Sequence, residues 1–150
     1  MRHLFLDIEA KRNALPWSPR MDNAEALAPP PCWDIVCISS MIVDIDRDPG
    51  GGAESNDPPT FAVKVRLGTF QADVREAIRS VEKLARAAQV VTFNGRGFDF
   101  PVIEATSYRL GIPAPGLFTK PLRGRYDDGH LDLMDHISNY GATKSISLDL

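Results

Sequence analysis

The residues near the start of the chain, Leu4 to Glu9, form the pattern that most constrains this sequence. The order leucine, phenylalanine, leucine, aspartate, isoleucine, glutamate is typical of a buried strand with two carboxylates at alternate positions. Because side chains on a strand alternate between its two faces, Asp7 and Glu9 share one face with Phe5. Two neighbouring acids on an apolar strand repel each other and resist loss of water, and a divalent cation between them removes both problems. The pair therefore predicts a metal-dependent enzyme.

Length and composition favour one soluble domain over residues 1–150. The chain has 150 residues, 43% hydrophobic and 25% charged, which are ordinary values for a globular protein with a real core. No apolar run approaches the roughly 18 residues of a membrane span. Asp7 comes too early for a signal peptide, so we expect a cytoplasmic protein. Cys32 and Cys37 lack C-x-x-C spacing and are expected to be reduced, partly buried thiols.

The charge balance limits how the chain can bind nucleic acid. A net charge of −3 and a pI near 5.6 argue against binding through a broad basic surface. An enzyme that acts on nucleic acid stays open, because metal-binding carboxylates add negative charge that bound cations offset. One local basic cluster, Lys120, Arg123 and Arg125, lies in a loop rich in proline and glycine, and we interpret it as a solvated loop.

The pattern along the chain predicts an α/β domain, a mixed sheet with helices packed against it. Two of the expected strands form an antiparallel hairpin around a flexible turn at 47–59, and Phe61, Val63 and Val65 share one of its faces. A long polar loop is expected at 10–32. The full set of expected elements is strands at 3–9, 33–46, 60–66, 89–93 and 130–134, helices at 71–88 and about 100–111, and a helical turn at 135–140.

A second informative segment runs from Val90 to Pro101. It reads as a buried strand, a tight turn with two glycines, and a helix with Asp99 at its entrance. Aspartate is a preferred N-cap, so helix capping by Asp99 is an open alternative to a functional role. The segment is not a nucleotide-binding glycine fingerprint, because Phe100 stands where a third glycine is needed.

Together the two segments carry a family resemblance. Asp7-x-Glu9, followed by Asn94-x-x-x-Phe98-Asp99, resembles the DEDD superfamily of 3′–5′ exonucleases, which have a ribonuclease H-like fold. The similarity is closest to predicted exonucleases related to the proofreading domain of family B DNA polymerases. It covers nearly the whole chain and includes the stretch 130–135.

The resemblance implies a role for each carboxylate. Asp7 would bridge two divalent cations, Glu9 would bind one of them, and Asp99 would hold the second through water. The reaction would be two-metal hydrolysis of a phosphodiester bond at the 3′ end of single-stranded or frayed DNA. Mg²⁺ or Mn²⁺ suits a site made only of oxygen ligands.

The resemblance also implies substrate contacts just after the expected strand at 89–93. Asn94, Gly95 and Phe98 would contact the terminal nucleotides, with Phe98 packing on a base or sugar. Trp17 lies in the long loop, where it could stack on single-stranded bases or serve as a loop anchor.

The family's third motif, Tyr-x-x-x-Asp on a late helix, is not found. Tyr108, Tyr126 and Tyr140 are followed four residues later by Ile112, His130 and Lys144. We therefore expect a truncated domain without its C-terminal helices and fourth carboxylate, which binds metal weakly and cleaves poorly. One alternative is that His130 and Asp135 supply the His-x-x-x-x-Asp spacing of the family's other branch, which belongs on a helix.

Other interpretations remain open at this stage. The fold could serve a non-catalytic nucleic-acid-binding or partner-docking module, and a homodimer could form through the truncated C-terminal surface. Asp132 on the last strand could orient a site residue, but a structural role is favoured. His3 is interpreted as a surface or edge residue.

Overall fold

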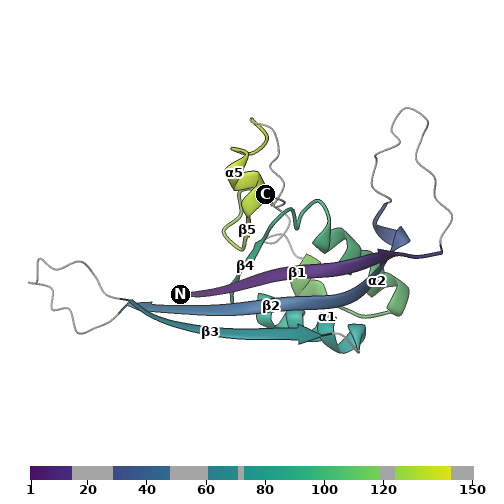
Figure 1. The fold of residues 1–150 in the computed structure, drawn as a ribbon, viewed down its shortest axis with the longest axis horizontal. Coiled ribbons are helices and arrows are strands. Elements are labelled where there is room, and N and C mark those ends of the chain that lie inside the picture. The colour runs from purple at the N-terminus through teal and green to yellow at the C-terminus, as the bar shows by residue number, and fades with distance from the viewer. Residues whose placement is uncertain (15–28, 48–60, 71–72, 119–123, 143–150) are drawn as a thin grey trace, which may run out of the picture.

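The computed structural model describes residues 1–14, 29–47, 61–70, 73–118 and 124–142. Its centre is a five-stranded sheet in the order β3-β2-β1-β4-β5 (Figure 1). Three antiparallel strands, β1 (Arg2–Arg12), β2 (Trp33–Arg47) and β3 (Phe61–Phe70), form one side. Two short strands parallel to β1, β4 (Gln89–Thr92) and β5 (His130–Asp132), complete it. This arrangement confirms the predicted mixed sheet.

Two helices cover one face of this sheet, α1 (Val74–Ala85) and α2 (Asp99–Leu110). Their buried side chains join those of the strands and of the short α3 (Pro115–Phe118) in one core. Asp73 caps α1 by accepting hydrogen bonds from the backbone N–H groups of Arg75 and Glu76. Gly111, with φ 63°, ends α2 in the left-handed conformation, as the sequence predicts. The core is formed mainly by Leu4, Leu6, Ile8, Ile38, Ile78, Val81, Val90, Val102, Ile103 and Leu117.

Several predicted boundaries were wrong. β1 continues to Arg12, because β2 pairs with it through a bulge between Glu9 and Ala10. β3 continues to Phe70 for the same reason, since its pairing with β2 begins at Ile38. The last strand ends at Asp132, and the helix α5 (Leu133–Ile137) starts two residues earlier than predicted, because Asp132 caps it.

The predicted loop at 10–32 is shorter at both ends than expected. Its start belongs to β1, its end contains a 3₁₀ turn, η1 (Pro30–Cys32), and residues 15–28, with Trp17, lie outside the described residues. Cys37 in β2 is partly buried as predicted, whereas Cys32 in η1 is buried, and neither forms a disulfide. Within the described part of the chain, no helix is long and apolar enough to cross a membrane.

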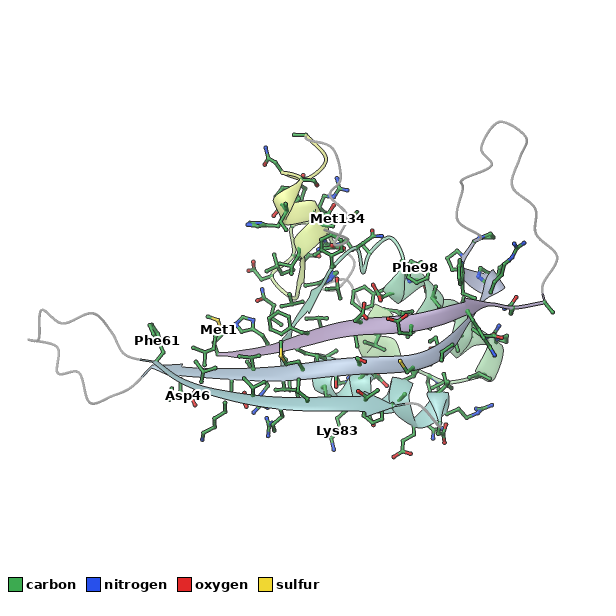
Figure 2. The ribbon with its side chains drawn as sticks, in the orientation of Figure 1. Met1, Asp46, Phe61, Lys83, Phe98 and Met134 are labelled. Carbon is green, nitrogen blue, oxygen red and sulfur yellow. The ribbon has the colours of Figure 1, made fainter. Side chains whose placement is uncertain are left out.

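The second face of the sheet carries an apolar patch that α1 and α2 do not cover. The strand register aligns Phe5 with Met41 and Leu67 across β1, β2 and β3, on the face opposite the core. Alternate residues towards the hairpin tip continue this stripe, and Phe61 projects at that tip (Figure 2). We define the apolar patch as Phe5, Met41, Val43, Ile45, Phe61, Val63, Val65 and Leu67.

Candidate active site

Asp7 and Glu9 lie on β1 just before its bulge, and both side chains are exposed on the face opposite the core. The alternation predicted from the sequence is therefore present, because Leu6 and Ile8, which alternate with the two acids, are buried on the core face. Partial burial and the negative charge of Glu9 raise the pKa of Asp7 above its ordinary value. Among the described residues, no basic side chain forms an ion pair with either carboxylate.

Asp99 reaches β1 next to this pair, from the start of α2. It is the first residue of α2, its exposed fraction is only 3%, and its Oδ1 accepts a hydrogen bond from the backbone N–H of Ile8 at 3.1 Å. The pairing of β4 with β1 ends at Phe5, so the Ile8 N–H lies beyond the reach of β4. Asp99 supplies the acceptor that the shorter strand lacks.

Capping is therefore not the role of Asp99. Phe98 holds the N-cap position of α2 and makes no side-chain cap bond, so the capping alternative was wrong. Burial is the main cause that raises the pKa of Asp99, to about 7, and the negative charge of Asp7 adds to it. The hydrogen bond from Ile8 acts in the opposite direction, because it stabilises the carboxylate.

The three carboxylates thus belong to one electrostatic group with Asp7 at its centre. Asp7 raises the pKa of Asp99, and Glu9 raises that of Asp7. In the described ranges, however, no three histidine, cysteine, aspartate or glutamate side chains converge closely enough to enclose a metal ion. Oxygen donors without a basic partner suit a hard cation, and Mg²⁺ is commonly bound by one or two carboxylates together with water and substrate phosphates.

The turn from Asn94 to Gly97 connects β4 with α2 and so determines where Asp99 lies. Asn94 adopts φ 60°, a conformation that asparagine tolerates better than most residues. Gly95 is buried, and a Cβ atom there would collide with the side chain of Thr92. Its N–H donates to Thr92 Oγ1 and its carbonyl accepts from the N–H of Phe100. The close approach of the Thr92 side chain therefore explains why this position is a glycine.

The three residues expected to contact substrate lie close together in sequence and differ in exposure. Asn94 is half-buried at the start of the turn. Phe98 is half-buried where α2 begins (Figure 2). Its ring packs edge-on against Trp33 with centroids 5.4 Å apart. Gly95 has both backbone polar groups bonded within the turn. Substrate contacts at all three stay predictions.

Asp132, favoured as structural from the sequence, has three backbone partners. Its carboxylate accepts hydrogen bonds from the N–H groups of Asn94 at 2.8 Å, Arg96 at 3.0 Å and Met134 at 3.2 Å. The first two hold the turn before Asp99, and the third caps α5. Asp132 therefore connects β5 and α5 to the turn.

The alternative pair, His130 and Asp135, does not lie on one helix. His130 is buried on β5, where its Nε2 lies 2.7 Å from Thr92 Oγ1. Asp135 lies on α5 and pairs with Arg96 at 2.7 Å and Arg125 at 3.2 Å. The structure therefore does not fit the histidine-type alternative, which needs His130 on a helix.

Sequence reasoning missed Arg96 and Thr92. The guanidinium of Arg96 also donates to the carbonyl oxygens of Gly124 and His130, so this side chain connects the turn to β5 and to the segment before it. These partners are about 30 residues away and follow no periodic pattern, so no local signal identifies them. Of the predicted basic cluster, Arg125 pairs with Asp135, whereas Lys120 and Arg123 lie outside the described residues.

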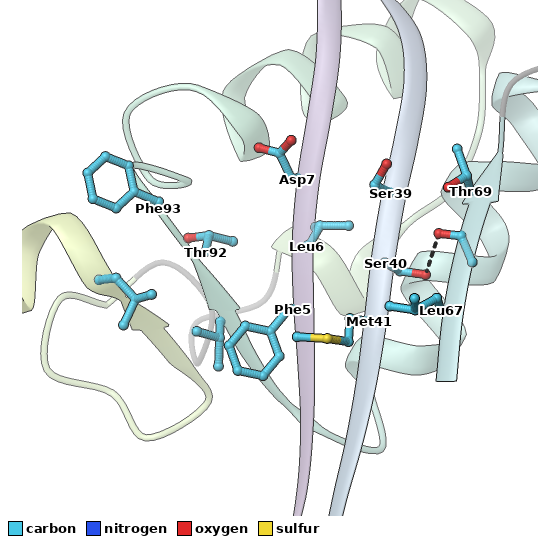
Figure 3. A pocket seen from close by; sticks show the side chains of 13 residues that line it. Phe5, Leu6, Asp7, Ser39, Ser40, Met41, Leu67, Thr69, Thr92 and Phe93 are labelled. Atoms are coloured by element: carbon cyan, nitrogen blue, oxygen red, sulfur yellow. Dashed lines mark hydrogen bonds between the residues drawn. The ribbon is translucent and has the colours of Figure 1, made fainter. Parts of the chain in front are cut away.

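A groove of about 400 Å³ runs along the open face of the sheet beside Asp7. Figure 3 shows Asp7 in line with Ser39 and Thr69, while Phe5, Met41 and Leu67 form the next row across the strands. Val91 and Phe93 of the β4 side and Leu133 also line it. The groove thus connects Asp7 with the part of the apolar patch formed by Phe5, Met41 and Leu67.

The fold has a known structural relative. Over 93% of this chain, the structure is similar to the family B DNA polymerase from the hyperthermophilic archaeon Pyrobaculum calidifontis, with a TM-score of 0.50 and 19% identity. The chain spans 16% of the length of that polymerase. Together with the mixed five-stranded sheet, this likeness identifies a ribonuclease H-like α/β fold.

Comparison of the sequence with family models identifies the family. A family model described as a predicted 3′–5′ exonuclease related to the exonuclease domain of PolB matches residues 62–150. The chain belongs to this family, and the matched region contains Asn94, Asp99 and Asp132 but not Asp7 or Glu9. No match is found among curated proteins.

Proposed function

We propose that this chain is a metal-dependent 3′–5′ exonuclease domain that acts on the 3′ end of single-stranded or frayed DNA. The observation that carries the proposal is the group formed by Asp7, Glu9 and Asp99 on and beside β1, beyond the end of its pairing with β4. The family relation supports exonuclease chemistry, and the group supplies the carboxylates that such chemistry needs.

The electrostatics of the group favour a bound cation. Asp99 is buried beside Asp7, and no described basic side chain compensates these charges. A fold that keeps such carboxylates together loses stability unless they are protonated or coordinate a cation. We propose Mg²⁺ or Mn²⁺ as the cation, which Asp7, Glu9 and Asp99 would hold.

The residues of the chain have distinct tasks in this reaction. Two such cations would supply an activated hydroxide and stabilise the leaving 3′ oxygen. Asp7 and Glu9 hold their oxygens on a rigid, paired strand, and the Ile8 hydrogen bond fixes the carboxylate of Asp99 against the same strand. Asn94 and Phe98 would bind the terminal nucleotides, and Gly95 gives the turn the space it needs.

We also propose that residues 1–150 alone cleave slowly. The sequence contains no Tyr-x-x-x-Asp, and the group near Asp7 has three carboxylates where the family resemblance implies four. Fewer carboxylates give weaker binding of a divalent cation, and therefore a lower rate at a given metal concentration.

The test is a nuclease assay on 5′-labelled single-stranded DNA with Mg²⁺ or Mn²⁺. We expect slow shortening from the 3′ end that disappears with EDTA and in Asp7→Ala and Asp99→Ala. Asp73→Ala, which removes an aspartate that caps α1, is the matched control and should keep the activity. An inactive wild-type chain that also binds no Mn²⁺ would refute the proposal, and fast cleavage would refute the impairment alone.

The apolar patch favours a second candidate role, docking of a second copy of this chain. Val63 is 58% exposed and Leu67 is 80% exposed, although they lie on a regular strand within a sheet. The opposite face of the same hairpin is charged, with Asp44 bridging Arg2 and Arg66. One face is thus suited to water and the other to an apolar partner.

The absence of charge in the apolar patch favours self-association over nucleic-acid binding. All alternate positions from Phe61 to Leu67 on β3 and from Met41 to Ile45 on β2 are apolar, so a phosphate backbone would find no cation there. Ten residues of β3 give a length of about 33 Å, and three strands with their side chains a width of about 15 Å. Their product is about 500 Å², below the ~800 Å² that each partner of a stable dimer buries, so we expect a weak, concentration-dependent dimer.

A further inference from the structure

We propose that Asp132 is a positioning residue for Asp99, and that it acts through the turn from Asn94 to Gly97. The inference rests on the proposed function, because it assigns Asp99 to the metal site. Asp132 does not touch Asp7, Glu9 or the Ile8 amide in any described contact. Its negative charge acts on Asp99 through space, and its hydrogen bonds act on Asp99 through the backbone of the turn.

The two carboxylate oxygens of Asp132 have different partners. Oδ1 accepts from the N–H groups of Asn94 and Met134, and Oδ2 accepts from the N–H of Arg96. Asn94 and Arg96 both belong to the turn, so one buried carboxylate on β5 fixes two positions of the turn. Hydrogen bonds from backbone N–H groups to a carboxylate are among the stronger ones in proteins.

Further backbone hydrogen bonds connect the turn to the residues on either side of Asp99. The carbonyl of Asn94 accepts from the N–H groups of Gly97 and Phe98, and the carbonyl of Gly95 accepts from the N–H of Phe100. Asp99 lies between Phe98 and Phe100, two of the residues whose N–H groups make these bonds. Its backbone therefore moves with the turn, and its carboxylate can reach the Ile8 N–H only while the turn keeps its place.

The side chain of Arg96 adds further hydrogen bonds between the turn and the end of the sheet at β5. It bonds Asp135 at 2.7 Å and the carbonyl oxygens of Gly124 and His130 at 3.0 and 3.1 Å. The turn is thus bonded to β5 and α5 through both the backbone and the side chain of Arg96. The segment 130–135, noted in the sequence for its family resemblance, thereby receives a function: it anchors the turn that carries a proposed metal ligand.

The experiment compares Asp132 with an aspartate that has an equivalent local role elsewhere. Asp73 also accepts two backbone N–H bonds, but only within its own helix. We would measure Mn²⁺ binding to the full chain by calorimetry for wild type, Asp132→Ala and Asp73→Ala. Both variants should lower the melting temperature, but only Asp132→Ala should weaken Mn²⁺ binding, by about 10- to 100-fold as is typical of residues that support metal ligands.

A measurement without metal separates this inference from the proposed function. The amide signal of Ile8 in a ¹H–¹⁵N spectrum recorded in EDTA should shift in Asp132→Ala and stay in place in Asp73→Ala, because Asp99 is its acceptor. If wild type is inactive and binds no Mn²⁺, the proposed function fails, and the Ile8 signal still decides the positioning. An unchanged Ile8 signal and equal Mn²⁺ affinities in the two variants would overturn the inference.

Asp132→Asn covers the case in which Asp132→Ala does not fold. Asparagine is a good N-cap and retains one acceptor oxygen for Asn94 and Met134, but its amide nitrogen cannot accept from the Arg96 N–H. This variant should shift the Ile8 signal and weaken Mn²⁺ binding less than the alanine variant does. An Asn variant that is identical to wild type in both measurements would count against a role for the Arg96 bond.

Discussion

The carboxylate of Asp99 bonds the backbone N–H of Ile8 at 3.1 Å, across 91 residues of sequence. This bond connects the start of α2 to the centre of β1 and holds a buried acid close to the exposed Asp7. It explains why the pKa of Asp99 responds to Asp7, and why the geometry of the turn after β4 matters for the whole group.

The stability of the metal-free protein should depend on pH through Asp99. Its pKa is near 4 in the unfolded chain and about 7 in the fold, so between these values the folded state binds more protons. The free energy of unfolding should therefore fall as pH rises from 4 to 7, by up to about 4 kcal/mol. Urea unfolding in EDTA at pH 5 and pH 8 measures this, and Asp99→Asn should reduce the difference. An equally steep dependence in Asp99→Asn would assign it to other groups.

Binding of Mn²⁺ should be linked to the same proton. A metal ligand must be deprotonated, so below pH 7 the cation competes with the proton on Asp99. We expect the apparent affinity to rise by up to about tenfold per pH unit from pH 5.5 to 7 and then to level off. Calorimetry in two buffers of different ionisation enthalpy would detect the released proton. Affinity that is independent of pH over this range would exclude Asp99 as a ligand.

Gly95→Ala should destabilise the protein more than Gly111→Ala does. The added methyl group at Gly95 would overlap the side chain of Thr92 in a buried turn, so we expect a loss of about 2–3 kcal/mol. At Gly111 the space is open and only the positive φ opposes alanine, which costs about 1 kcal/mol. Denaturant unfolding of both variants gives the comparison. Equal losses would mean that the turn can shift to accept the methyl group.

The sequence predicted the elements whose signal is local. Alternation in Leu4 to Glu9 placed Asp7 and Glu9 on one face, and the apolar stripe of α1 and the glycine after α2 marked both helices. The order of strands and helices and the family resemblance were sufficient for the fold class.

The missed features depend on partners far away in the sequence. Nothing near Asp99 indicates that β4 ends early and leaves the Ile8 N–H without a strand partner. The partners of Asp132 and Arg96 are likewise fixed only when β5 pairs with β4. The ends of β1 and β3 were placed too early, because pairing with the long β2 extends both strands past their clear alternation.

The apolar patch makes a prediction about oligomeric state. If a second copy covers the patch, light scattering after size exclusion should give a dimer for wild type and a monomer for Val65→Lys, because a charge in an apolar interface is costly to bury. Val65 is 54% exposed in the single chain, so this variant should fold normally. Lys64→Glu is the matched control, since the neighbouring residue points to the opposite face, and it should remain dimeric. A wild-type chain that is monomeric at all concentrations would assign the patch to a different partner, and a dimer that survives Val65→Lys would place the interface elsewhere.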